Sequence, residues 1–91
     1  MQTKAVLTVL GKDRSGVVAT ISGTLFAMDA NIDDISQTIL SGMFAMTMMV
    51  SLNEATHPFE EVQEALAADS EKLGMQVQLQ REDVFNFMHA V

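Results

Sequence analysis

Residues 11–18 read GKDRSGVV, which places two glycines around four polar residues directly before an apolar run with helical spacing. Such a loop can present backbone N–H groups at the positive end of a helix, where they can bind one carboxylate. Asp13, in the same loop, could hold an ammonium group, and the two together would recognise a free amino acid. A structural alternative stays open, in which Asp13 or Ser15 caps the helix and Gly16 only makes the turn.

Phosphate chemistry is poorly matched by this loop. A P-loop continues after its second glycine with Lys and then Ser or Thr, whereas Val17 follows Gly16 here. The dinucleotide pattern G-x-G-x-x-G is absent as well. Hydrolases of the acylphosphatase type need an Arg-bearing cradle within a G-x-V-Q-G-V-x-F-R run, and this chain offers only Lys12 and Arg14 without that run. We therefore expect neither a nucleotide site nor this hydrolase.

Other residues that could do chemistry have simpler explanations. Asp33 and Asp34 are neighbours in a predicted strand, so their side chains should point to opposite faces and cannot form a catalytic pair. No nucleophile has a base nearby in the sequence. His57 and His89 have no companion ligands, and the chain has no cysteine. We expect a protein that is not an enzyme and holds no metal or cofactor.

Composition narrows the class of protein further. A length of 91 residues suggests one domain, and a 48% hydrophobic content with eight Met suggests that some apolar surface is buried against another chain. A formal charge of −7 disfavours direct binding to nucleic acid. The apolar run ending at Leu10 is too short to span a membrane. We expect a cytoplasmic homodimer that binds neither membrane nor nucleic acid.

The hydrophobic pattern predicts six main elements and a tail. Strands are expected at 3–10, 31–40, 43–52 and 75–80, with a hairpin turn at Ser41 and Gly42. Helices are expected from 17 to about 29 and from Pro58 to the stop at Gly74. Their apolar stripes consist of Val18, Ile21, Leu25 and Met28 in the first helix, and Phe59, Val62, Leu66 and Leu73 in the second.

The order β-α-β-β-α-β predicts an α+β fold of the ferredoxin-like type: a four-stranded antiparallel sheet with two helices on one face. Right-handed crossovers place the first and third strands in the centre. The nearly continuous apolar run at 3–10 predicts a strand covered on both faces. Residues 1–81 form the expected domain. The segment 82–91 is expected to be a short helical tail whose apolar residues, Val84, Phe85 and Met88, pack on the domain or on a partner chain.

The stretch GKDRSGVVATISGTLFAMDANIDDISQ (11–37) resembles the signature of the ACT-domain family: G-x-D-R-x-G-[IV]-[VL], a helix, and a short turn into N-I-x-x-[IL]. It is most similar to small free-standing members related to the glycine-cleavage regulator. The resemblance implies a regulatory module that binds an amino acid or another small ligand where two domains meet. Many members have Asn and Pro where this chain has Asp13 and Ser15, so which end of a ligand meets which residue stays open.

Carried over by position, the resemblance implies a ligand site that includes the loop and the start of the second strand. The expected ligand-binding residues are Asp13, Arg14, Ser15, Gly16, Val17, Asn31 and Ile32. The leading hypothesis is a non-catalytic regulatory module that binds an amino acid in a cleft between two chains and signals to a regulated protein. The alternative is an interaction module with no small ligand, which docks through sheet edges or the C-terminal tail.

Overall fold

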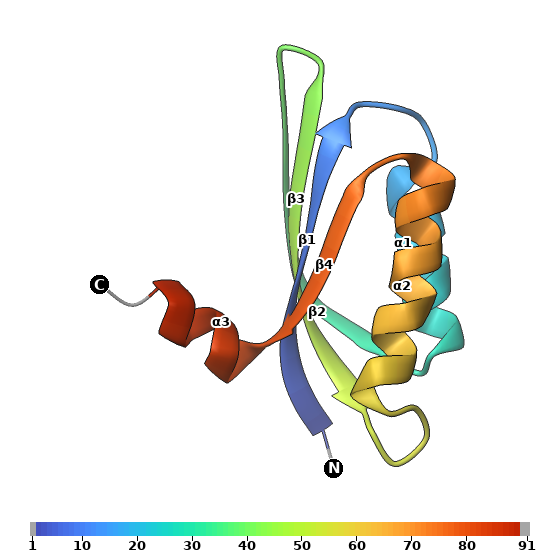
Figure 1. Ribbon diagram of the computed structural model, residues 1–91, viewed down its shortest axis with the longest axis vertical. Coiled ribbons are helices and arrows are strands. Elements are labelled where there is room, and N and C mark those ends of the chain that lie inside the picture. The colour runs from blue at the N-terminus through green and yellow to red at the C-terminus, as the bar shows by residue number, and fades with distance from the viewer. Residues whose placement is uncertain (1, 90–91) are drawn as a thin grey trace.

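The computed structural model describes residues 2–89, and side chains up to residue 86. Four strands form one antiparallel sheet in the order β2-β3-β1-β4, so the first and third strands are central, as predicted. Two helices cover one face of this sheet, and a third lies on the other side (Figure 1). The predicted fold class is confirmed. The elements are β1 (Gln2–Lys12), α1 (Val17–Ala27), β2 (Asn31–Leu40), β3 (Met43–Asn53), α2 (Phe59–Leu73), β4 (Gln76–Arg81) and α3 (Glu82–His89).

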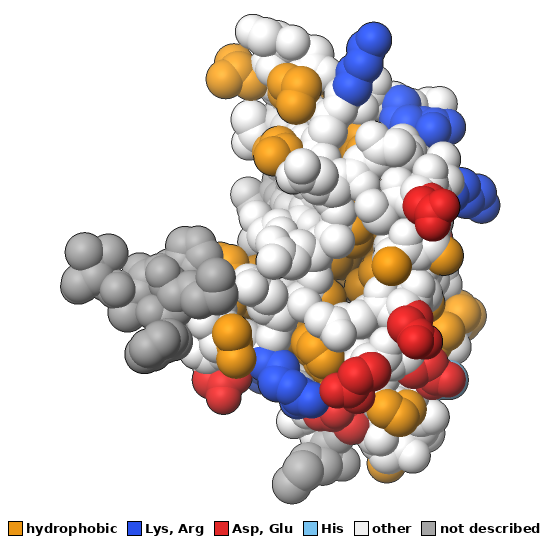
Figure 2. Space-filling model, in the orientation of Figure 1, with side chains coloured by type: hydrophobic (Ala, Val, Ile, Leu, Met, Phe, Trp, Pro, Cys, Tyr) orange, Lys and Arg blue, Asp and Glu red, His pale blue; other side chains and the backbone are white. Residues whose placement is uncertain are grey.

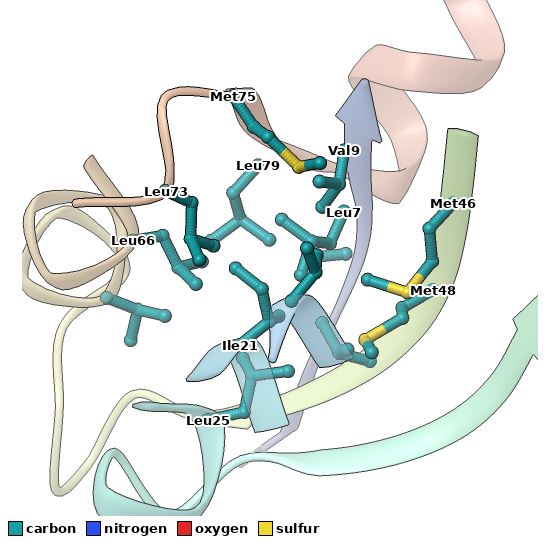
Figure 3. Packing of buried hydrophobic residues seen from close by; sticks show 14 of the residues in the cluster. Leu7, Val9, Ile21, Leu25, Met46, Met48, Leu66, Leu73, Met75 and Leu79 are labelled. Carbon is teal, nitrogen blue, oxygen red and sulfur yellow. The ribbon is translucent and has the colours of Figure 1, made fainter. Parts of the chain in front are cut away.

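The core lies between the sheet and the pair α1 and α2. Figure 3 shows side chains of the central strands meeting those of both helices. Strand alternation explains this arrangement, because every second residue of β3 points to the same face. The buried residues of β3 on that face are those the pattern predicts: Phe44, Met46, Met48, Val50 and Leu52.

The first helix buries a slightly different stripe from the predicted one. Val17, Ile21 and Leu25 are its buried residues, whereas Val18 and Met28 are only partly buried against the core. The buried residues are four apart, so they lie on one side of the helix, the side that packs on the sheet and α2. The helix ends at Ala27, slightly before the predicted end.

A buried polar contact joins the two covering helices. Asp69 lies in line with the predicted apolar stripe of α2 and is only 8% exposed. The hydroxyl of Thr24 on α1 donates a hydrogen bond to its carboxylate. This contact satisfies a group that would otherwise destabilise the core.

The edge strand β2 contains a bulge at Asp33. Ile32 pairs with Val50 and Asp34 with Met49, so Asp33 is an extra residue in the ladder. The Asp33 carboxylate accepts a hydrogen bond from Ser51, whose side chain lies on the sheet face away from α1 and α2. The register places Asp34 on that face too. The prediction that the two carboxylates point to opposite faces is therefore wrong, because the bulge interrupts the alternation.

The sheet face opposite α1 and α2 is only partly covered. α3 contacts β1 and β4 at the end of the sheet away from the β2–β3 hairpin (Figure 1). Val6 on this face is buried, but Leu10 further along β1 is 47% exposed. The expectation that both faces of the first strand are covered therefore holds for only part of its length within one chain. Among residues 2–89, no helix is long and apolar enough to cross a membrane.

Candidate functional site

The loop between β1 and α1 turns into the helix through a left-handed glycine. Gly16 is the N-terminal cap residue of α1, with φ 85° and ψ 2°. Backbone at this φ favours glycine, because a Cβ would crowd the following carbonyl. No neighbouring atom occupies the space within 4 Å of where a side chain would project from Gly16. The turn function that the sequence predicts for this glycine is confirmed.

The first N–H groups of α1 have no partner in the described part of the chain. No side chain caps the helix, so Asp13 and Ser15 do not perform the capping role considered for them. None of residues 2–89 accepts a hydrogen bond from the amide of Val17, Val18 or Ala19. These amides lie at the positive end of the helix, directly after Gly16, which has no side chain to block them. They are suited to a small anionic group such as a carboxylate.

Arg14 is used to hold α2 in place. Its Nη1 donates to the carbonyl oxygens of Lys72 and Leu73, at 3.5 and 3.3 Å. These carbonyls belong to the last turn of α2, where the backbone carries partial negative charge. The position of Arg14 at the predicted site is therefore explained by contacts within the chain.

The other residues of the predicted site differ in which of their groups are exposed and which make contacts within the chain. The N–H of Asp13 donates to the carbonyl of Gly42 at 2.8 Å, which ties the loop to the β2–β3 hairpin. The side chains of Asp13 and Ser15 are exposed. Val17 is 2% exposed, so its side chain lies in the core and does not meet a ligand.

Asn31 and Ile32 lie apart from the loop within one chain. They follow the C-terminal end of α1, whereas Gly16 precedes its N-terminal end (Figure 1). A helix of 11 residues separates the two groups by about 16 Å at about 1.5 Å per residue. The Asn31 side-chain amide donates to Asp33 Oδ1 at 2.6 Å. Ile32 is partly buried against the core. The structure therefore brings together residues 13–17 and separates them from 31 and 32.

Two polar clusters were not predicted from the sequence. Hydrogen bonds from Ser51, Asn31 and Lys4 lower the pKa of Asp33 below its ordinary value. Elsewhere, the Glu54 carboxylate receives hydrogen bonds from Arg81, at 2.9 Å, and from Thr3. Both clusters link strands that are distant in sequence, and no local motif marks them.

The Glu54 contacts lower the pKa of this carboxyl group to about 2, with the hydrogen bond from Arg81 as the largest cause. The Arg81 guanidinium also lies 4.4 Å from the centre of the Phe59 ring. The ion pair and the cation–π contact together join the end of β4 to the start of α2.

Two surface hollows of the single chain are lined by residues outside the loop at 13–16. One of about 310 Å³ is lined by Gln2, Thr3, Lys4, Arg81, Glu82 and Asp83. Another of about 420 Å³ is lined by Leu10, Gly11, Met43, Gly74, Met75 and Gln76. Among the side chains of residues 2–86, no three from His, Asp or Glu are grouped so as to hold a metal ion. Neither hollow encloses the amides at the start of α1.

These features define a small α+β domain with free helix amides at its first strand–helix loop. The chain belongs to the ACT domain family, whose model matches residues 3–80. ACT domains are typically regulatory modules that bind small ligands.

Individual relatives agree with this assignment. A UPF0237 protein of Listeria monocytogenes is 46% identical over 86 residues, which cover 94% of this chain and 97% of the relative. The solved ACT domain protein from Streptococcus pneumoniae is 38% identical, with a TM-score of 0.79 over 91% of this chain and 93% of that one.

A putative glycine cleavage system transcriptional repressor shares the fold, with a TM-score of 0.80 at 18% identity over 89% of this chain and 46% of that one. The predicted resemblance to small ACT-domain proteins is confirmed, and the likeness to the glycine cleavage repressor is one of fold.

Proposed function

We propose that this chain is a non-catalytic cytoplasmic regulatory module that binds an amino acid in a cleft between two copies. The observation that carries the proposal is the set of unpartnered amides of Val17, Val18 and Ala19 behind the left-handed Gly16. These amides receive the ligand carboxylate, and the exposed carboxylate of Asp13 receives its ammonium group. Family membership supports binding of a small ligand, because ACT domains are typically ligand-binding modules.

A second copy at the edge strand β2 would supply walls around this ligand. Every residue from Asp33 to Leu40 is exposed, and this strand has an unpaired edge. Beside it, α1 presents the exposed small residues Ala19 and Gly23, and Phe26, which is 85% exposed. A second β2 paired antiparallel here would cover both surfaces.

That pairing also explains the separation of the site residues. Asn31 is at the start of β2, and the loop lies toward the other end of α1. Antiparallel pairing of the two β2 strands carries Asn31 of the second copy toward the loop of the first. Asn31 and Ile32 then complete the site across the interface.

Isothermal titration against the twenty amino acids tests the proposal, at protein concentrations well above micromolar. We expect heat with at least one of them. Asp13→Ala and Asn31→Ala should each weaken its binding tenfold or more, whereas Glu71→Ala, on an exposed part of α2, should leave it unchanged. Absence of heat with all twenty would overturn the amino-acid assignment. A monomer that binds with full affinity would overturn the shared cleft.

The hydrolase alternative is not supported by the position of its basic residue. Arg14 donates to the carbonyls of α2 and does not face an open cradle. The regulated partner of the module would be a protein that responds to the ligand-bound dimer. If the titration shows no heat with any amino acid, the result favours the alternative, an interaction module that binds no small ligand.

A further inference from the structure

Half of the sheet face opposite α1 and α2 has no cover from the described side chains, which end at residue 86. α3 lies over one end of this face, and the part toward the β2–β3 hairpin is here called the open half-face (Figure 1). Leu10 and Met43 are each 47% exposed on it, and Leu40 is 73% exposed. By register, its residues are Thr8, Leu10, Lys12, Ser36, Thr38, Leu40, Met43, Ala45, Thr47, Gln76 and Gln78.

The open half-face carries none of the chain's acidic residues, although the net charge is −7. Figure 2 shows this flank, between the hairpin and α3, without red side chains. Two copies can meet here without bringing their surplus negative charges together. A basic partner would instead be drawn to the acidic surfaces elsewhere. The charge distribution therefore favours a second copy as the occupant.

α3 supplies apolar surface beyond what its own sheet covers. Val84 and Phe85 are consecutive, so they point about 100° apart around the helix. Phe85 is partly buried, whereas Val84 is 45% exposed. The first turn of α3 is acidic, with Glu82 and Asp83, and the rim of the open half-face carries the basic Lys12. The outer side of α3 and the open half-face are thus complementary in both apolar character and charge.

A hollow at the hairpin end of this face can receive an apolar side chain. It measures about 420 Å³, and Leu10, Met43 and Gln76 line it from the open half-face. It lies over β1 and the start of β4, the same two strands that α3 contacts at the other end of the sheet. Reversing the strand direction of a second copy therefore brings its α3 over this hollow.

We propose that a second copy of this chain packs on the open half-face through its α3, with the two copies related by a two-fold axis. The strands of the two sheets run in opposite directions, and the two α3 helices share one layer between them. Each α3 adds a layer about 10 Å thick on the sheet, so two copies approach most closely when each α3 lies beside the other rather than on top of it. Placing α3 on α3 would leave both open half-faces uncovered.

The available area is adequate for a specific, weak contact. Four strands about 4.8 Å apart and about five residues of about 3.4 Å give a half-face of roughly 300 Å². Two half-faces with the outer sides of two helices reach about 1,000 Å², the lower limit for a specific interface. The association should therefore weaken on dilution. It uses a different surface from the β2 edge, so it stands independently of the proposed ligand site.

Charge variants on the open half-face test the contact by molar mass. We expect a tetramer for the native chain from light scattering after size exclusion, because each copy has two self-interfaces. Gln76→Glu with Gln78→Glu keeps the side-chain shapes and should halve the mass. Ala67→Glu with Ala68→Glu adds the same charge on exposed positions of α2 and should not. An unchanged mass in the first variant would overturn the proposal.

A designed disulfide gives a second readout that does not depend on the edge contact. Ala5 pairs with Arg81, the residue directly before α3. Leu10 lies five residues further along β1, which is about 17 Å at about 3.4 Å per residue. A disulfide needs Cα atoms within about 7 Å. Leu10→Cys with Val84→Cys should therefore form a reducible bond only between copies.

Peptide mapping should detect the bond between positions 10 and 84, and should detect no bond between 67 and 84 in Ala67→Cys with Val84→Cys. The absence of a 10–84 bond under oxidising conditions would contradict the proposed packing, even where the edge dimer forms and binds a ligand. Ligand binding without this bond would leave the proposed function intact.

Discussion

The guanidinium Nη1 of Arg14 lies 3.3 Å from the carbonyl oxygen of Leu73, so the loop before α1 holds the last turn of α2. The N–H of the preceding residue, Asp13, donates to Gly42 in the hairpin. The loop is therefore attached to α2 and to β2–β3 on either side of its free amides. A group bound at these amides would act on both elements.

Removal of the Arg14 side chain should weaken the attachment to α2. Arg14→Ala should lower the free energy of unfolding by about 0.3–1 kcal/mol, the range for a cation near a helix C-terminus. Arg14→Lys should recover part of that loss, since it keeps the charge but not the planar donor. Urea denaturation measures both values. A stability equal to that of the native chain in Arg14→Ala would show that the contact does not hold α2.

Substitution by Ala should have opposite effects on stability at Gly16 and at Gly23. Gly16→Ala should cost about 1–2 kcal/mol of stability, because Gly16 has φ 85°. Gly23→Ala should instead raise stability by about 0.8 kcal/mol, since Gly23 is inside α1 with open space around it. Thermal and urea unfolding of the two variants give the comparison. A stability of Gly16→Ala equal to that of the native chain would show that the turn at Gly16 is not left-handed.

The buried contact between α1 and α2 should depend on both partners. Thr24→Val keeps the shape but leaves the Asp69 carboxylate buried without its donor, at a cost of about 1–3 kcal/mol. Thr20→Val, also partly buried on α1, serves as the matched control and should cost less. A double-mutant cycle with Asp69→Ala measures the coupling. Additive losses would exclude a direct interaction.

The Glu54 cluster should make stability depend on acid pH. Its pKa is about 2 in the fold, against an ordinary value of 4.5, mainly because of Arg81. A depressed pKa means that the stabilisation is complete above about pH 4.5 and is lost as pH falls toward 2. Glu54→Gln and Arg81→Met should both flatten the dependence of unfolding free energy on pH in this window. An unchanged slope in both variants would contradict the assignment.

Local pattern was sufficient to predict the elements and their order. The alternation in β3 identifies the buried face that includes Met46 and Met48, and the spacing of Val62 and Leu66 identifies that of α2. Gly16, Gly42 and Gly74 mark turns that the structure places in the left-handed region. Connection rules then leave the observed strand order, because right-handed crossovers exclude the alternatives.

Contacts between distant segments could not be predicted in this way. The partner of Arg14 is 58 and 59 residues away in sequence, and that of Thr24 is 45 away. The buried position of Asp69 had a usable signal, since it continues the spacing of the α2 stripe. The bulge at Asp33 had none, because one extra residue in an edge strand leaves no mark in the hydrophobic pattern.

The bulge determines how β2 tolerates changes in length. In a regular strand, residues three apart point to opposite sides, yet Ile32 and Ile35 pair with Val50 and Met48, which share one side. Deleting Asp33 would remove the bulge and leave Ile32, Asp34 and Ile35 opposite Val50, Met49 and Met48, whereas deleting a residue nearer the hairpin would reverse the side chains on one side of the deletion or break the pairing with β3. Relatives with a β2 one residue shorter should therefore lack the residue at position 33 rather than one closer to the hairpin.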